Sequence, residues 1–183
     1  RRQRQMCIRD RKDAVRHSYT SGGRRESVAE HSWRITLMAY FVSDEFPEAD
    51  LLKIMKMCLI HDLGEAFTGD IPAFEKTDKD SEKEADVLGE WVKTLPEPFD
   101  KEMAELYQEM EEQQTLEARI YKALDKLEAL IQHNESDIKT WISLEYDLQM
   151  TYGNEQVKFS EYLTELRAKV REDSIQKIQK KGC

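Results

Sequence analysis

Apolar residues recur along this chain every three or four positions, without a sustained alternation of apolar and polar residues. Spacing of this kind gathers apolar side chains on one face of an α-helix, whereas alternation is typical of a half-buried strand. Glycine and proline are confined to short polar segments that separate the periodic stretches, where they interrupt helices. The pattern therefore predicts an all-α fold built as a helical bundle.

The polar breaks divide the chain into a series of expected helices. A short helical piece around residues 13–17 leads into a polar, glycine-rich loop over residues 19–24. A longer helix is then expected to begin at Ser27, because Ser27 and Glu30 have the spacing of a capping box. Further helices are expected over residues 49–63, 81–95, 99–112, 115–133, 139–152 and 155–181.

His31 and the adjacent pair His61 and Asp62 are expected to face the protein core. His31 lies one turn inside its helix, on the stripe formed with Ile35, Met38 and Val42. The pair continues the apolar stripe of the next helix near its C-terminus, where the partial charge of free carbonyls favours a cation. Burying unpaired polar groups costs roughly 2 to 7 kcal/mol each, and a bound metal ion removes that cost.

Asp125 is the candidate ligand whose role the pattern leaves open. It lies off the main apolar stripe of the helix over 115–133, on a second face with small or partly apolar residues. That arrangement predicts a central helix packed on two sides. The carboxylate fits a metal ligand and fits equally a solvent-facing partner of Lys122, Arg119 or Lys126.

A site of two imidazoles and two carboxylates would use His31, His61, Asp62 and Asp125. This mixed nitrogen and oxygen set suits one divalent transition metal, Mn, Fe, Co, Ni or Zn, rather than the all-oxygen sites of Ca or Mg. His133 carries no motif and is expected to be exposed. The loop over residues 67–74 is expected to leave the site directly after Glu65.

Composition narrows the class of protein. The 183 residues, 39% of them hydrophobic, suit one domain. A net charge of −9 argues against nucleic acid as the partner, and no apolar run approaches the roughly 18 residues of a membrane span. Three cysteines without a C-x-x-C spacing predict neither a disulfide framework nor a thiolate zinc site, and fit the reducing cytoplasm.

The first eleven residues are expected not to belong to the domain. Residues 6–11 resemble the translation of a transposase adapter used in sequencing-library preparation, so residues 1–11 are interpreted as an artefact or a disordered arm. A single domain is then expected over residues 12–183.

Three segments together carry a family resemblance. They are V-A-E-H-S at residues 28–32, H-D-L-G-E-A-F-T-G-D at 61–70 and A-L-D-K-L at 123–127. This order of histidine, His-Asp pair and distant aspartate resembles the HD-domain metal-dependent phosphohydrolases, and most of all their 5′-deoxynucleotidase branch. The resemblance implies a helical HD-domain bundle with a buried site for one metal, held by His31, His61, Asp62 and Asp125.

The same resemblance implies roles for four further residues. Glu65 matches the catalytic acid, Asp70 a second residue of the active site that contacts sugar or phosphate, and Arg16 the phosphate-contacting arginine. His17 departs from the pattern, because the branch has a tryptophan there that presses on the sugar. Discrimination against ribonucleotides is therefore expected to be weaker in this chain.

The expected function is release of phosphate from nucleoside 5′-monophosphates, mainly deoxynucleotides, by a homodimer. One alternative is a different phosphoester, such as a cyclic nucleotide, a nucleoside triphosphate or an alarmone. Another is a metal-stabilised module that binds nucleotide without turnover.

Overall fold

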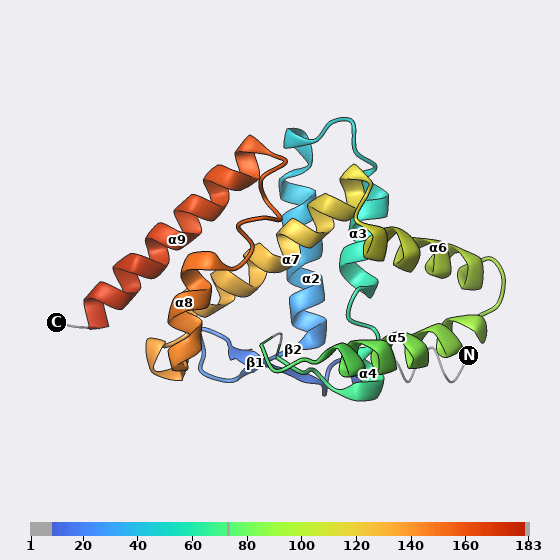
Figure 1. Cartoon of the computed structure of the whole chain (residues 1–183), viewed down its shortest axis with the longest axis horizontal. Coiled ribbons are helices and arrows are strands. Elements are labelled where there is room, and N and C mark those ends of the chain that lie inside the picture. Colours follow the sequence, from blue (N-terminus) through green and yellow to red (C-terminus); the bar gives the residue numbers. More distant parts are fainter. Residues whose placement is uncertain (1–8, 73, 182–183) are drawn as a thin grey trace.

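The structure is a computed structural model that describes residues 9–72 and 74–181. It is a bundle of helices with one short β-hairpin at its edge, so the expected all-α class is confirmed (Figure 1). In chain order the elements are β1 (Val15–Tyr19), β2 (Arg25–Ser27), α2 (Val28–Phe41), the 3-10 helix η1 (Ser43–Glu45), α3 (Leu51–Ile60), α4 (Glu65–Thr68), α5 (Asp78–Lys93), α6 (Phe99–Glu112), α7 (Leu116–Glu135), the 3-10 helix η2 (Ile138–Thr140), α8 (Ser143–Thr151) and α9 (Glu161–Lys181).

Helix α7 is the central element of the bundle. It crosses the middle of the molecule and contacts α2, α3, α6 and α9 (Figure 1). Ile120 and Leu127 are buried on its main apolar face, and Ala118 and Tyr121 are buried on its second face. The prediction of a helix packed on two sides is therefore confirmed.

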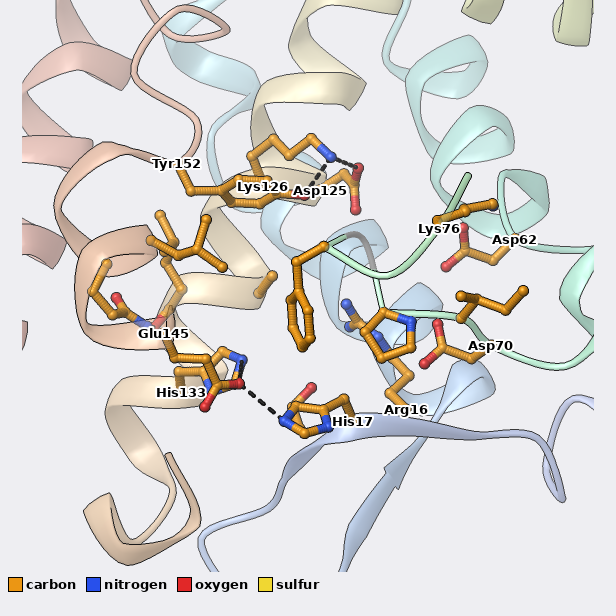
Figure 2. Close-up of a pocket in the computed structure, with 18 of the residues that line it drawn as sticks. Arg16, His17, Asp62, Asp70, Lys76, Asp125, Lys126, His133, Glu145 and Tyr152 are labelled. Carbon is orange, nitrogen blue, oxygen red and sulfur yellow. Dashed lines mark hydrogen bonds and ion pairs between the residues drawn. The ribbon is translucent and has the colours of Figure 1, made fainter. Parts of the chain in front are cut away.

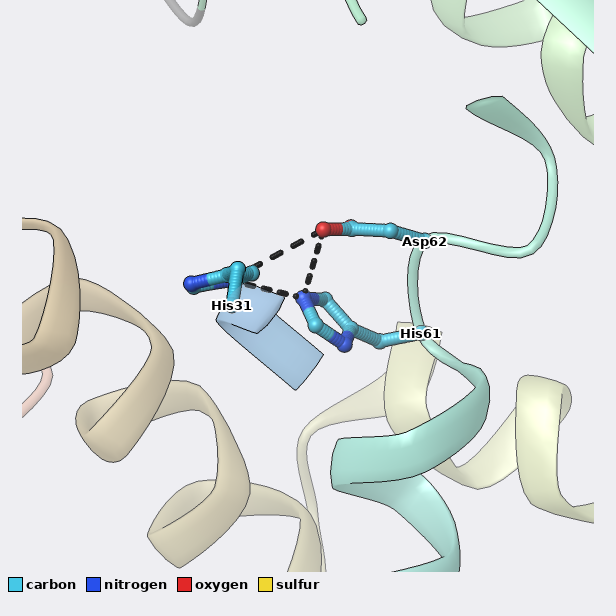
Figure 3. A group of neighbouring side chains, drawn as sticks. All are labelled: His31, His61 and Asp62. Atoms are coloured by element: carbon cyan, nitrogen blue, oxygen red, sulfur yellow. Dashed lines mark hydrogen bonds and ion pairs between the residues drawn. The ribbon is translucent and has the colours of Figure 1, made fainter. Parts of the chain in front are cut away.

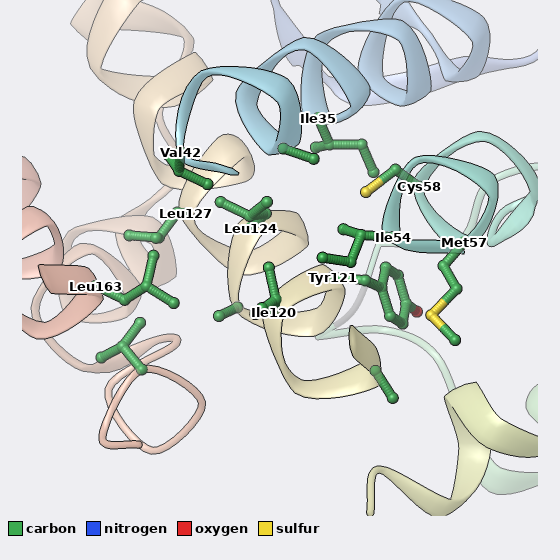
Figure 4. Close-up of a cluster of buried hydrophobic side chains, with 14 of the residues drawn as sticks. Ile35, Val42, Ile54, Met57, Cys58, Ile120, Tyr121, Leu124, Leu127 and Leu163 are labelled. Atoms are coloured by element: carbon green, nitrogen blue, oxygen red, sulfur yellow. The ribbon is translucent and has the colours of Figure 1, made fainter. Parts of the chain in front are cut away.

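The main hydrophobic core holds α2, α3 and α7 together. Ile35 from α2, Met57 from α3 and Leu124 from α7 are all fully buried within it (Figure 4). Burial of one such side chain contributes about 1.5 to 3 kcal/mol, as an upper estimate. This core fixes the relative positions of the three helices that carry or precede the expected metal ligands.

The helical piece expected over residues 13–17 is wrong, because this segment is strand β1. It pairs antiparallel with β2, with Val15 opposite Ser27 and Tyr19 opposite Arg25. The glycine-rich loop is the connecting turn, and Gly23 has a φ of 83°, which favours glycine. Five residues are too few to show the alternation of apolar and polar residues that marks a strand. The strand that pairs with β1 lies beyond the turn, so the sequence of residues 13–17 alone did not reveal the hairpin.

Helix α2 begins as expected, and α3 ends earlier than expected. Ser27 caps α2 and forms the predicted capping box with Glu30. Helix α3 ends at Ile60, so that His61 and Asp62 lie in the turn that follows. Gly64 continues into α4, and a Cβ on Gly64 would lie 2.5 Å from Cγ of Glu84. A larger residue in this turn would therefore require the Glu84 side chain of α5 to move.

The other expected helices are present with shifted ends. Helices α5, α6 and α7 match the predicted ranges closely, whereas α8 begins at Ser143 and α9 at Glu161. A 3-10 helix and a turn occupy the first residues of those two predicted ranges. No helix within residues 9–72 and 74–181 is long and apolar enough to cross a membrane.

Arg11 packs into the bundle. Residues 1–8 lie outside the described residues, and the idea that residues 1–11 do not belong to the domain stays a prediction. Arg11 is 7% exposed and donates a hydrogen bond of 2.7 Å to the carbonyl of Leu59. It also donates to the hydroxyl of Ser32. These contacts link the start of the chain to α2 and α3.

We expect the Arg11→Ala variant to melt at a lower temperature than the parent, and deletion of residues 1–8 to leave the melting temperature unchanged. Arg11→Ala removes the donors to Leu59 and Ser32, at a cost of about 1 to 3 kcal/mol. Thermal unfolding measures both variants, with the exposed Lys12→Ala as matched control. An unchanged melting temperature for Arg11→Ala would show that Arg11 is dispensable, as the sequence suggested.

Candidate metal centre and pocket

Three of the expected ligands meet where α2 approaches the end of α3. Nε2 of His31 lies 3.2 Å from Nε2 of His61 (Figure 3). Oδ2 of Asp62 lies 2.9 Å from the same atom of His61 and 3.7 Å from that of His31. One atom of each side chain therefore faces a common point.

Asp125 reaches the same point from α7. Its Oδ1 lies 3.4 Å from Nε2 of His31 and 3.8 Å from Nε2 of His61. Its Oδ2 lies 3.2 Å from Nζ of Lys122 and 3.6 Å from Nζ of Lys126. The sequence left open whether Asp125 is a metal ligand or the ion-pair partner of a lysine. The geometry allows both roles, since one oxygen faces the histidines and the other faces the lysines.

The second nitrogen of each imidazole is held by a hydrogen bond. Nδ1 of His31 contacts the carboxylate of Glu128, and Nδ1 of His61 lies 2.9 Å from the carbonyl of Cys58. Both acceptors favour a proton on Nδ1, which leaves the lone pair of Nε2 for another partner. Sequence reasoning missed Glu128, although a charged residue four positions after Leu124 on a buried stripe was a usable signal.

This donor set fits a divalent metal ion. The two imidazole nitrogens lie 2.9 to 3.8 Å from each other, from one oxygen of Asp62 and from one oxygen of Asp125. Two ligands bound at about 2.0 to 2.2 Å to one ion are separated by about 3 Å or slightly more. Lone pairs facing one another at this distance repel unless a proton or a cation lies between them.

Glu26, His31 and Glu128 form a second group of side chains close enough to bind a metal, but an arginine already lies beside its carboxylates. The guanidinium of Arg16 lies 3.2 Å from Oε2 of Glu26 and 3.1 Å from Oε2 of Glu128. A positive charge is thus already present beside these two carboxylates, so we place the candidate metal at the first group.

The electrostatic field at the centre favours positive charge. Burial and Arg16 lower the pKa of His31, but Glu128 and a hydrogen bond that His31 donates to Asp125 more than offset them and raise it to about 9. In the metal-free protein Nε2 of His31 therefore carries a proton, which a bound metal ion would replace. Burial raises the pKa of Asp62, yet His61 outweighs it and holds that pKa below the usual range. The carboxylates therefore stay ionised and attract a cation.

Glu65 lies beside the metal centre at the start of α4. It is 7% exposed, and its Oε2 has no hydrogen-bond partner among the described residues. Burial, followed by repulsion from Asp62 and Asp70, raises the pKa of Glu65 to about 11. In the metal-free protein this carboxyl therefore keeps its proton at neutral pH and is placed to donate it.

The metal centre opens into a pocket of about 360 Å³ (Figure 2). Its wall is made by β1, by the loop after α4, and by α7 and α8. Four cationic side chains line it, namely those of Arg16, Lys76, Lys122 and Lys126.

The three residues expected to bind substrate all line this pocket. Arg16 reaches into it from β1, beside His17 (Figure 2). Successive residues of a strand ordinarily point to opposite faces, yet Arg16 and His17 both line the pocket. The pairing of β1 with β2 is irregular between Val15 and Tyr19, where these two residues lie. The carboxylate of Asp70 accepts a hydrogen bond from the backbone N–H of His17, and burial raises its pKa.

His133 is only 19% exposed at its side chain, so the expectation of an exposed residue is wrong. It lies on the pocket-facing side of α7, where its Nε2 is 3.3 Å from Oε1 of Glu145. Burial lowers the pKa of His133 to about 4, which keeps the imidazole neutral. Glu145 itself was missed, because its position near the start of a charged helix gave no sign of burial.

Comparison with known proteins gives a family match over most of the chain. A family model described as HD domain matches residues 8–167. Human 5′-deoxynucleotidase HDDC2 is 32% identical over 119 residues, which are 64% of this chain and 57% of that relative. The Dictyostelium discoideum protein of the same name is 30% identical over 152 residues, 79% of this chain and 75% of that relative. The match thus spans little more than half of the human relative.

Solved structures share the fold. A predicted metal-dependent phosphohydrolase from Magnetospirillum magnetotacticum aligns with a TM-score of 0.80 at 24% identity, over 96% of this chain and 92% of that one. A conserved hypothetical protein from Pyrococcus furiosus aligns with a TM-score of 0.69 at 30% identity, over 91% and 96% of the two chains.

We expect Asp125→Ala to lower metal content and to abolish the rise in melting temperature that metal gives the parent. Metal bound only by the folded state stabilises it by about 4 kcal/mol at a thousand times its dissociation constant. Lys122→Met is the matched control, because it removes the same ion pair from the other side and leaves Oδ1 of Asp125 in place. Elemental analysis and thermal unfolding with chelator measure both. Full metal content in Asp125→Ala would place the fourth ligand elsewhere.

Proposed function

The chain belongs to the HD domain family, and we propose that it is a metal-dependent phosphohydrolase that releases phosphate from nucleoside 5′-monophosphates, including deoxynucleotides. The observation that carries this proposal is the convergence of His31, His61, Asp62 and Asp125 at one end of a cation-lined pocket. The name 5′-deoxynucleotidase borne by the human and Dictyostelium relatives supports the choice of substrate.

The four ligands would hold one divalent transition metal, chosen from Mn, Fe, Co, Ni and Zn. Such an ion, when bound, lowers the pKa of a coordinated water and offsets negative charge that develops on the phosphoryl group. Glu128 and the carbonyl of Cys58 orient the two imidazoles for this task, as described above.

Glu65 is proposed as the group that moves the proton. Its raised pKa leaves a proton on a carboxyl that faces the pocket, where it can pass to the departing 5′ oxygen of the nucleoside. A cation at neighbouring Asp62 would bring this pKa back toward neutrality, which suits a group that must also give the proton up.

Arg16 is proposed to bind the phosphate and Asp70 to position the sugar or phosphate. The side chain of Arg16 is 15% exposed and is held by Glu26 and Glu128, so its planar group is fixed before substrate arrives. Lys122 and Lys126 add positive charge beside Asp125. Together these groups favour an anion next to the metal centre.

Two alternatives remain distinguishable by experiment. A different phosphoester, such as a cyclic nucleotide, a nucleoside triphosphate or an alarmone, would use the same metal centre. A nucleotide-binding module without turnover would not require a buried carboxyl such as Glu65 to face the pocket. Phosphate release across a panel of these compounds separates the three functions.

We further propose a homodimer that works in the cytoplasm. Trp33, Leu37 and Phe41 lie one helical turn apart along α2 and are 61%, 36% and 74% exposed. A second copy covering this stripe would remove apolar surface from water. Analytical ultracentrifugation tests this, since Trp33→Glu should then dissociate the dimer, and a monomeric parent would contradict it. The cytoplasm fits Cys58, which is buried and free.

We expect Glu65→Gln to retain its metal and to lose roughly 10²-fold to 10⁴-fold in turnover, the range for a positioned acid or base. Glutamine keeps the shape of the side chain and cannot pass on a proton. Elemental analysis and steady-state phosphate release measure the two properties separately. Loss of metal in this variant would instead make Glu65 a ligand.

We expect Arg16→Ala to lower catalytic efficiency on deoxy- and ribonucleotides alike, because the part of the substrate that Arg16 is proposed to contact is the phosphate, which both kinds of nucleotide share. His17→Trp should raise the ratio of deoxy to ribo efficiency, since the larger indole excludes a 2′-hydroxyl. Both variants are assayed on matched deoxy- and ribonucleoside monophosphates. A ratio unchanged by His17→Trp would place His17 outside the sugar pocket.

A further inference from the structure

The end of the pocket away from the metal centre contains a buried carboxylate with one unused oxygen. Glu145, near the start of α8, is 2% exposed. Its Oε2 accepts a hydrogen bond of 2.7 Å from the backbone N–H of Ile142, which fixes the orientation of the carboxylate. Its Oε1 has no hydrogen-bond partner among the described residues.

Two imidazoles lie close to this oxygen, and neither makes an aligned hydrogen bond to it. Nε2 of His17 lies 3.1 Å away and Nε2 of His133 lies 3.3 Å away (Figure 2). Nε2 of His17 also lacks a hydrogen-bond partner among the residues described, so the short contact is not an aligned hydrogen bond. A buried carboxylate oxygen without a donor is costly, and a molecule that fills the pocket can supply the donor.

The surroundings of Glu145 suit the nucleoside part of a nucleotide. Ala129, Leu130 and Leu148 give this end an apolar wall. The rings of Phe74 and His17 pack edge to face, with their centroids 5.6 Å apart. An apolar wall with a few fixed polar atoms is typical of small-molecule sites, in which the polar atoms set orientation and specificity.

The distribution of charge orients the substrate. Arg16, Lys122 and Lys126 gather beside the metal centre, whereas Glu145 carries its negative charge at the opposite end. With a divalent ion held by the four ligands, a phosphate would be attracted to the first end, and the carboxylate of Glu145 would repel it from the second. Arg16 and His17 are adjacent in β1, so a nucleoside joined to a phosphate at Arg16 extends past His17 toward Glu145.

We propose that Oε1 of Glu145 accepts a hydrogen bond from a hydroxyl or amino group of the nucleoside, and that this contact determines which nucleotides the pocket prefers. The proposal rests on the proposed function, since it assumes a nucleotide in the pocket. It assigns to Glu145 a specificity role, and to His133 the role of a neutral wall beside it. The donor is either a sugar hydroxyl or an amino group on the base.

Glu145→Gln tests the proposal because it replaces the oxygen that faces the pocket with a hydrogen-bond donor. The N–H of Ile142 requires an acceptor, so the amide oxygen of the glutamine takes that place and its NH₂ group faces the pocket. A donor on the substrate then meets another donor. Asp147→Asn is the matched control, because it makes the same change of charge at an exposed position of α8.

The substrates are monophosphate pairs that differ by one donor. A ribonucleotide and its 2′-deoxy and 3′-deoxy forms test the sugar, while adenosine with purine riboside and guanosine with inosine test the base. The parent should prefer the donor-bearing member of one pair. Glu145→Gln should lose roughly 10-fold to 100-fold on that member, the value of a hydrogen bond to a charged group, and less than about 3-fold on its partner. Asp147→Asn should match the parent.

Several outcomes would overturn the proposal. One is a parent that treats the two members of every pair alike, which needs no variant and so does not depend on how Glu145→Gln folds. Another is a folded Glu145→Gln with unchanged preferences, the result expected if burial, which raises the pKa of Glu145, keeps this carboxyl protonated. A third is an equal loss on all substrates.

Calorimetric titration of the same pairs separates this proposal from the proposed function. A parent that binds the donor-bearing members more tightly but releases no phosphate would support the role of Glu145 and contradict the phosphohydrolase. A parent that releases phosphate without preference within any pair would support the phosphohydrolase and contradict the role of Glu145.

Discussion

The buried carboxylate of Glu128 joins the two functional parts of this molecule. It is completely shielded from solvent on α7, where it contacts Nδ1 of His31 and lies 3.1 Å from the guanidinium of Arg16. Burial raises the pKa of Glu128, but the charges of His31 and Arg16 outweigh burial and keep the carboxyl ionised. Removal of one partner from a buried ion pair costs about 3 to 5 kcal/mol, so these three residues hold one another in place.

The helical core explains why such a cluster can be maintained. Residues far apart in the sequence reach one point because α2, α3 and α7 pack on a common apolar core (Figure 4). The short turn between α3 and α4 then brings His61, Asp62 and Glu65 to the same side. The β-hairpin closes this end of the bundle and contributes Arg16 and His17. Stability of the core and geometry of the site thus depend on the same packing.

The sequence predicted the parts of the fold that depend on local periodicity. Apolar spacing and the Ser27 capping box gave α2 and the inward position of His31, and most helices follow the expected ranges. The hairpin was missed because its pairing is not local. Glu128 and Glu145 were missed for a different reason. A charged residue in a charged helix looks exposed until its buried partners, which come from other elements, are known.

Titration of metal-free protein with a divalent metal, while phosphate release from a deoxynucleoside 5′-monophosphate is followed, tests the central claim most directly. Because one ion is proposed to sit among His31, His61, Asp62 and Asp125, phosphate release should rise from the background and level off at one equivalent of metal per chain. Chelator should return it to the background. Release that persists in chelator, or that never appears at any metal content, would contradict a metal-dependent phosphohydrolase.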